Sequence, residues 1–429
     1  MDRLSTTKAI LANAADHVWR PWAPIHADHD PLLLVEGQGC EVVAADGRRF
    51  LDARAGVFNA ALGYGRQDVA TVMATQAVTL MAYTLQEAIT PPAAELATRL
   101  ARLFGEPLSR TFFCNSGSEA IESAIKVARM FHALSGAGHR RLIVSLAPGY
   151  HGSTLATAAM TGMPAVRALM EPLPEGFVLV PGDQAGSDPS AVAACALGAG
   201  ADQVAAVVVE PVLGVAGIRP LPLGYLAAVR RLCDGIGALM VVDEVMTGYG
   251  RTGRWFGYQH EPLVLPDIVV TSKGLTAGYA PLATMTCRQH IYEVFARDPV
   301  LGGLRHGFTT GGHATACAAA CAVLDAIETE GLVENAARVG VRLLSGLRTL
   351  IGEQGVRQVR GRGLLAAVEF DTADRAAEVA LRLRETHRVL ARLQGAVVAF
   401  APPLICTEVL ADRICEAMAC SLRPQAVAR

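Results

Sequence analysis

The chain has 429 residues, of which 52% are hydrophobic and 18% charged, so it can bury a large core divided between two or three structural units. A formal net charge of −2 excludes the basic character typical of a nucleic-acid-binding protein. No apolar stretch reaches the roughly 18 residues of a membrane span, and residues 1–8 lack the apolar core of a signal peptide, so we expect a cytoplasmic protein with no membrane partner.

Patterns along the chain predict an α/β fold. Residues up to about Leu51 look irregular apart from a short hairpin within 37–47. From about Asp68 to about Ile327, helical patterns alternate with apolar strand patterns at 111–113, 141–144, 204–209, 239–242 and 268–270. This alternation predicts a mostly parallel sheet covered by helices. We expect a large domain over 68–327 and a small α+β domain over 328–429, with the N-terminal segment 1–67 packing against the small domain.

The ten cysteines do not indicate a metal or redox site. None lies in a C-x-x-C pair, and Cys317 and Cys321 are one helical turn apart in an alanine-rich segment, where small thiols are ordinary core residues. We therefore expect free thiols, as in a reducing compartment, and no bound metal.

Two strand ends carry the most informative polar residues. The apolar run 238–242 ends at Asp243, and the run 267–272 ends at Lys273. Buried parallel strands deliver such groups to one edge of a sheet. Pyridoxal phosphate needs a lysine that holds it as a Schiff base and an acid beside its pyridine nitrogen. A buried ion pair that only supports the fold is the alternative.

Two further segments have the composition of a phosphate and ring site. Ser116, Gly117 and Ser118 stand where a long helix begins, so free amides there can receive a phosphate. Tyr150, in a glycine-rich turn after a strand, can lie over a flat heteroaromatic ring. A well-capped helix and a tyrosine that fills a loop are the structural alternatives. No G-x-G-x-x-G follows a strand near these sites, which excludes a dinucleotide site of that type.

Six motifs in order resemble the class III (ω-) aminotransferases, which are pyridoxal-phosphate enzymes of fold type I. They are Asn115-Ser116-Gly117-Ser118-Glu119-Ala120, Tyr150-His151-Gly152, Glu210-Pro211, Asp243-Glu244-Val245, Ser272-Lys273-Gly274 and His306-Gly307-Phe308-Thr309. The resemblance spans nearly the whole chain, and it implies the fold, the cofactor and a homodimer with shared active sites.

The resemblance also implies a role for each matching residue. Lys273 corresponds to the lysine that holds the cofactor and moves the proton, and Asp243 to the acid that pairs with the pyridine nitrogen. The remaining cofactor contacts are Ser116, Gly117 and Ser118 at the phosphate, Tyr150 and Val245 on the two faces of the ring, Glu210 near its O3′ side, and Thr309 reaching the phosphate from the neighbouring subunit.

On the substrate side, Arg392 matches the family's mobile arginine, whose guanidinium clamps a substrate carboxylate. Arg388 is a weaker alternative. The segment after Glu210 has Val215 where one branch of the family has a second acid that pairs with this arginine. Phe58 matches a pocket aromatic, and Trp19 and Trp22 are candidates for the entrance. Each of the three aromatics is equally compatible with a plain core position.

The implied reaction is a ping-pong transfer of an amino group from a primary amine or ω-amino acid to a 2-oxo acid, either pyruvate or 2-oxoglutarate. The alternative on the same scaffold is an amino-acid epimerase, racemase or decarboxylase. A cofactor-binding regulator would need a basic DNA-binding appendage, which neither terminus supplies.

Overall fold

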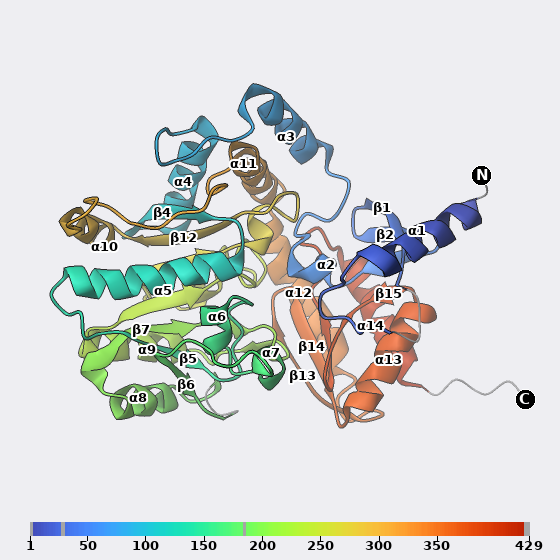
Figure 1. The fold of residues 1–429 in the computed structure, drawn as a ribbon. Helices are drawn as coiled ribbons and strands as arrows, with labels where there is room; N and C mark the ends of the chain where they lie inside the picture. Colours follow the sequence, from blue (N-terminus) through green and yellow to red (C-terminus); the bar gives the residue numbers. More distant parts are fainter. Residues whose placement is uncertain (1–2, 27–30, 183–185, 424–429) are drawn as a thin grey trace, which may run out of the picture.

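The computed structural model describes residues 3–26, 31–182 and 186–423. Figure 1 shows the large central sheet with its helices on one side of the molecule, and the C-terminal elements beside the N-terminal strands on the other. In the part of the chain that is described, no helix is long and apolar enough to cross a membrane.

The central part of the chain contains the largest sheet. Its elements are α3 (Gln67–Leu80), α4 (Pro91–Phe104), β4 (Leu108–Cys114), α5 (Gly117–Leu134), β5 (Leu142–Leu146), α6 (Leu155–Ala159), α7 (Pro164–Arg167), β6 (Phe177–Val180), α8 (Pro189–Gly198), η2 (Ala201–Gln203), β7 (Val204–Val209), β8 (Val212–Leu213), β9 (Arg219–Pro220), α9 (Tyr225–Ile236), β10 (Leu239–Asp243), η3 (Gly257–His260), β11 (Ile268–Thr271), η4 (Lys273–Leu275), β12 (Ala283–Arg288), α10 (Gln289–Val294), η5 (Phe295–Arg297) and α11 (Ala314–Thr329).

Seven described strands form this sheet in the order β4-β12-β11-β10-β7-β5-β6. β12 runs antiparallel to both of its neighbours, and the pairs β11–β10, β10–β7, β7–β5 and β5–β6 are parallel. Along the chain after β5, strand β6 is added on one side of β5, whereas β7, β10 and β11 are added on the other side. The ends of strands from distant segments therefore lie next to one another. The predicted mostly parallel sheet is confirmed.

Alternate residues of β10 pack on the two faces of the sheet. Leu239 and Val241 belong to the core cluster that contains α5 residues, whereas Met240 and Val242 belong to the one that contains α9 residues. This period of two explains why β10 appears in the sequence as a continuous apolar run, since both of its faces are buried. Helices thus cover both faces of the sheet.

The N-terminal segment has more structure than the sequence predicted. Its elements are α1 (Arg3–His17), β1 (Leu34–Gln38), β2 (Glu41–Ala44), β3 (Arg49–Asp52) and α2 (Ala55–Phe58). The hairpin expected within 37–47, with its turn at Asp46-Gly47, corresponds to β2 and β3, which pair antiparallel, and β1 pairs antiparallel with β2 as well. The expectation of an otherwise irregular segment is wrong. Most described residues of α1 are exposed, so the apolar periodicity by which an amphipathic helix is recognised is weak there.

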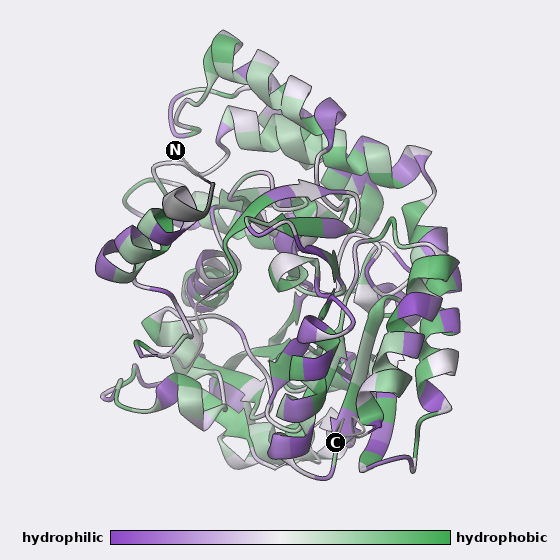
Figure 2. Cartoon of the chain, turned by 90° about the vertical axis from the view of Figure 1, so that its right-hand side faces the viewer, coloured by the Kyte–Doolittle hydropathy of each residue, from purple (hydrophilic) through white to green (hydrophobic). Residues whose placement is uncertain are grey.

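The C-terminal part forms a second, smaller sheet. Its elements are α12 (Leu332–Arg348), β13 (Val356–Arg362), β14 (Leu365–Phe370), α13 (Ala373–Glu385), β15 (Val389–Leu390), β16 (Arg392–Gln394), β17 (Val397–Phe400) and α14 (Glu408–Leu422). Four of these strands pair in the order β13-β14-β17-β16, while β15 pairs in parallel with β3. Strands from the two ends of the chain therefore share a sheet. Figure 2 shows hydrophilic and hydrophobic residues alternating along the outer helices, as expected for helices with one face toward a core.

Candidate active site

Four neighbouring strands end in the residues that the sequence singled out. Lys273 follows β11, Asp243 ends β10, Glu210 follows β7, and Tyr150 lies four residues after β5. Because these strands are adjacent and parallel, their carboxyl ends meet at one edge of the sheet. This edge is where ligands bind in open α/β sheets.

Asp243 is buried and held by two hydrogen bonds. Its Oδ2 lies 2.8 Å from Nδ1 of His151, and its Oδ1 accepts a 3.0 Å bond from the backbone N–H of Val245. Burial alone would lower the pKa of His151, but the hydrogen bond and charge of Asp243 outweigh it and raise that pKa. The imidazole therefore favours a charged or proton-donating state beside a fixed carboxylate.

Glu210 organises the two loops on either side of it. Its Oε1 accepts a 2.9 Å bond from the backbone N–H of Tyr150, and its Oε2 accepts a 3.0 Å bond from that of Gly214. Burial of the carboxyl, together with the nearby charge of Asp243, raises the pKa of Glu210 even though His151 opposes the change. The side chain thus links the turn of Tyr150 to the segment after β7.

Lys273 is half-buried and stands at a strained position, with a φ of +38°. Such left-handed backbone at a non-glycine residue persists only where the surroundings enforce it, and it is concentrated at functional sites. Burial lowers the pKa of Lys273, and the charge of Arg392 adds to this, against the opposing effect of Asp243 and Glu210. Within the described residues, no ion pair within 4.0 Å joins Lys273 to Asp243.

The N-terminus of α5 faces the segment after β10. Ser116 caps the helix, its Oγ accepting a 3.2 Å bond from the N–H of Glu119. A Cβ added at Gly117 would lie 3.1 Å from both methyl groups of Val245, so glycine permits this close approach. First-turn amides such as those of Gly117 and Ser118 have no acceptor within the helix, and are available to an anion.

The turn after Tyr150 closes over Ser118. The Oγ of Ser118 accepts a 3.1 Å bond from the N–H of Ser153, and the hydroxyl of Tyr150 lies 2.9 Å from Oγ of Ser153. Between them Gly152 has a φ of +139°, and a Cβ there would lie 2.4 Å from Oγ of Ser118. The glycine is therefore required both for its backbone conformation and for the space beside Ser118.

Phe58 lies near both Lys273 and Arg392, the arginine predicted for the substrate side. Nζ of Lys273 is 5.9 Å from the centroid of its ring, and Cζ of Arg392 is 5.8 Å from the same centroid. Phe58 is buried, with 3% of the residue's surface exposed. The structure thus brings Phe58, Lys273 and Arg392 together.

Other predicted residues lie away from this group. Arg388 points elsewhere, with its Cζ 5.6 Å from the ring of Phe50. Trp19 and Trp22 are 90% and 71% exposed, so neither packs against the site within one chain. Thr309 is also exposed. Its neighbour Thr310 donates a 2.7 Å bond to Asn115, which connects this loop to the start of α5.

The residues at the sheet edge fit pyridoxal phosphate. A buried carboxylate, a half-buried amine with a lowered pKa, a half-buried tyrosine and helix-terminal amides are brought to one place by four strands and one helix. These are the groups that the cofactor's ring nitrogen, aldehyde, ring face and phosphate require. In the described chain, no cluster of three or more His, Cys, Asp or Glu side chains could hold a metal ion.

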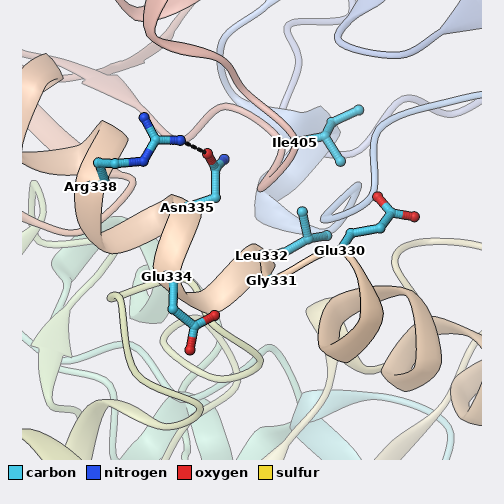
Figure 3. A pocket seen from close by; sticks show the side chains of 7 residues that line it. All are labelled: Glu330, Gly331, Leu332, Glu334, Asn335, Arg338 and Ile405. Atoms are coloured by element: carbon cyan, nitrogen blue, oxygen red, sulfur yellow. Dashed lines mark hydrogen bonds between the residues drawn. The ribbon is translucent and has the colours of Figure 1, made fainter.

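A separate pocket of about 600 Å³ lies where α11 meets α12, and it contains none of the predicted site residues. Glu330, Glu334, Asn335 and Arg338 line it together with Ile405, as Figure 3 shows. Arg338 donates to Asn335 within the pocket, at 2.8 Å. Glu330 pairs with Arg66 and Arg338 with Glu408, so the groups lining this pocket differ from those at the sheet edge.

Sequence reasoning assigned no role to His151 or Arg54. His151 stands in the Tyr150-His151-Gly152 motif, but its hydrogen bond spans 92 residues to Asp243. The signal available in the sequence was a histidine beside a predicted site residue, and only the fold shows its partner. Arg54 stands four residues before Phe58 and carries no recognisable motif.

Comparison with known proteins agrees with this geometry. The family description Aminotransferase class-III matches residues 24–422. The chain is 39% identical to acetylornithine aminotransferase 1 of Bordetella bronchiseptica over 90% of this chain and 93% of that protein. It is 34% identical to the taurine–pyruvate aminotransferase of Rhodobacter capsulatus over 96% of each.

A solved structure described as a thermostable (S)-enantioselective omega-transaminase from Thermomicrobium roseum superposes with a TM-score of 0.91 at 33% identity, covering 97% of this chain and 98% of that one. The fold, the order of the motifs and the match over nearly the whole chain agree with one another. The chain belongs to the class III aminotransferases, a family of pyridoxal-phosphate-dependent enzymes.

Proposed function

We propose that the carboxyl edge of the large sheet binds pyridoxal phosphate and transfers an amino group from a primary amine or ω-amino acid to a 2-oxo acid in a ping-pong reaction. The observation that supports this most is the separation of roles at adjacent strand ends. Asp243 is fixed by His151, whereas Lys273 has no ion-pair partner among the described residues and is left available for chemistry.

The bound cofactor supplies an electron sink that stabilises the charge left when a proton leaves the substrate carbon. Asp243 would hold the ring nitrogen in its cationic form, and His151 keeps this carboxylate oriented. The pKa of Lys273 is below that of an ordinary lysine. Its Nζ accepts the proton that leaves the substrate carbon and then donates it to a second carbon atom. Ser116, Gly117 and Ser118 would hold the cofactor's phosphate, Tyr150 and Val245 would hold its ring, and Glu210 would support the polar groups beside it.

The substrate carboxylate is assigned to Arg392, whose guanidinium lies over the same aromatic ring as the amine of Lys273. A substrate bound between the two groups presents its reacting carbon to Lys273 and its carboxylate to Arg392. Phe58 is buried beside both groups and remains a candidate for the substrate side. Trp19 and Trp22 remain candidates for the entrance, since both are exposed on one chain.

We also propose a homodimer in which Thr309 completes the phosphate site of the partner. Thr309 is exposed in the single chain, beside a loop that Thr310 connects to the start of α5. Three apolar side chains in the C-terminal half of α3 and in the segment after it are exposed, namely Val78 (90%), Met81 (64%) and Ile89 (70%). They supply a surface for a second copy. The unpaired state of all ten cysteines supports a cytoplasmic location.

Two half-reactions followed by absorbance test this function. Adding an amine to the cofactor-loaded protein should remove the long-wavelength band of the bound cofactor, and adding pyruvate or 2-oxoglutarate should restore it. A panel of amines, ω-amino acids and both acceptors would identify the pair. Release of carbon dioxide, or racemisation of an amino acid without acceptor-dependent recovery of the band, would instead support the decarboxylase or epimerase alternative.

A further inference from the structure

Arg54 lies at the start of a strained segment that ends at Phe58. Ala55, Gly56 and Phe58 have φ values of +47°, +66° and +63°, and the backbone N–H of Phe58 donates a 3.1 Å bond to the carbonyl of Arg54. Left-handed backbone at two non-glycine residues is energetically unfavourable and is retained where it positions functional groups. The strain fixes Arg54 and the pocket aromatic as one unit.

Backbone pairing brings this unit next to Arg392. Arg392 in β16 pairs opposite Ala399 in β17. Two residues further along, Ala401 donates a 2.7 Å bond to the carbonyl of Ala53, the residue before Arg54. Arg54 and Arg392 are therefore brought near one another by segments more than 300 residues apart in the sequence.

Each of the two guanidinium groups has a buried nitrogen atom without a hydrogen-bond partner. The Nε atoms of Arg54 and Arg392 are inaccessible to solvent and form no hydrogen bond in the described chain. Burial lowers the pKa of Arg392, and the nearby charge of Arg54 lowers it further. Two half-buried cations of this kind are costly to keep together unless an anion binds between them.

A purely structural role for Arg54, as the counter-ion of Asp52, is weakly supported. Nε of Arg54 is 3.9 Å from Oδ1 of Asp52, which is too long for a hydrogen bond. Asp52 already accepts bonds from the backbone N–H of Gly56 at 2.7 Å, the hydroxyl of Tyr64 at 2.5 Å and the backbone N–H of Arg54 itself at 3.2 Å. The carboxylate is satisfied without the guanidinium.

We propose that Arg54 is a second cationic contact for the substrate, and that Arg54 and Arg392 together select dicarboxylic over monocarboxylic 2-oxo acids. The pair offers two positive charges to a ligand with two negative ones, whereas a monocarboxylate leaves one charge unmatched. This inference rests on the proposed function, because it assumes that Arg392 faces the substrate.

Calorimetric titration of the cofactor-loaded protein with glutarate and with pentanoate tests the pair. These unreactive five-carbon acids differ by one carboxylate. The wild type should bind glutarate at least about tenfold more tightly, as one charge-assisted contact provides. Arg54→Met should abolish this preference and leave pentanoate binding nearly unchanged, while Arg54→Lys should retain part of it. Arg357→Met, at an arginine that is 64% exposed, is the matched control and should behave as the wild type.

Equal affinity of the wild type for the two acids, or a glutarate preference that survives in Arg54→Met, would overturn the proposal. If Arg54→Met proves unfolded by its thermal melting curve, Arg54→Gln replaces it as the charge-free variant. The amine half-reaction separates the two levels of inference. A wild type that passes the half-reaction but shows no glutarate preference retains its function and loses only the role of Arg54, whereas failure of the half-reaction itself refutes the function.

Discussion

Asp243 and Lys273 stand at the ends of neighbouring parallel strands, yet their side chains form no ion pair within 4.0 Å in the described chain. Asp243 is occupied by His151 and by the backbone N–H of Val245. Lys273 instead has its amine 5.9 Å from the centroid of the Phe58 ring. A pair that served only the fold would be expected to neutralise itself, because an unpaired buried charge is costly. The separation favours a site in which a ligand lies between the two groups.

The Asp243→Asn variant should still bind some cofactor, but its turnover rate should fall at least about 100-fold. Removal of one preorganised electrostatic contact from an active site typically lowers the rate by this much. The amide keeps the shape of the side chain and removes the charge that stabilises a cationic ring nitrogen. Turnover and cofactor content, measured on the same preparation, separate the two effects. A normal rate at normal cofactor content would refute the role of Asp243.

His151→Gln should destabilise the apoprotein by about 1–3 kcal/mol, since a buried carboxylate loses a charged partner. The pKa of His151 is raised above its usual 6.5 in the folded protein. Its stabilising contribution is therefore fully present below about pH 6.5 and is lost as the pH rises through the folded value.

Urea unfolding of the wild type and His151→Gln from pH 5.5 to pH 9 measures this contribution as a difference. The difference in free energy of unfolding should shrink as the pH rises. A difference that is constant, or one that grows with pH, would show that the imidazole is not held in its charged form by Asp243.

Gly152→Ala should weaken cofactor binding sharply, because the added Cβ would lie 2.4 Å from Oγ of Ser118 and the backbone has a φ of +139°. Gly136→Ala is the matched control. Its φ is +82°, but nothing lies within 4 Å of the added Cβ. The control should lose only about 1–3 kcal/mol of stability from backbone strain. Equal cofactor affinities of the two variants, measured by fluorescence titration, would remove Gly152 and Ser118 from the site.

Thr309→Val should lower cofactor affinity in a way that a second chain can repair. In a mixed dimer of Thr309→Val with Lys273→Ala, one site receives Lys273 from the first chain and Thr309 from the second. Such a site is complete only if Thr309 acts across the interface. Recovery of activity on mixing and refolding the two variants supports the shared site, while a mixture no more active than its components places Thr309 in its own chain's site or outside both.

The sequence was most informative where burial is continuous. Asp243 and Lys273 could be found because both flanking strands are buried on two faces and so appear as long apolar runs. The sequence left Ser116 and Ser118 open as the cap of α5, and the structure shows that Ser116 caps it. The boundaries at 67 and 327 remain predictions.

Other features depend on contacts that no local pattern encodes. The bond from His151 to Asp243, and the approach of Arg54 to Arg392 through Ala53 and Ala401, join segments that only the completed sheets bring together. The exposure of Thr309 and Trp19 cannot be interpreted from one chain, because a second copy decides what covers them.

Reductive trapping tests the central claim most directly. The chain contains three lysines, Lys8, Lys126 and Lys273, so the amine that holds the cofactor can be identified without ambiguity. After the cofactor-loaded protein is reduced with borohydride and digested, mass mapping should find the added pyridoxyl group on the peptide that contains Lys273. Lys8→Ala should label as the wild type does, and Lys273→Ala should not label. A label on Lys8 or Lys126, with the Lys273 peptide unmodified, would contradict the account.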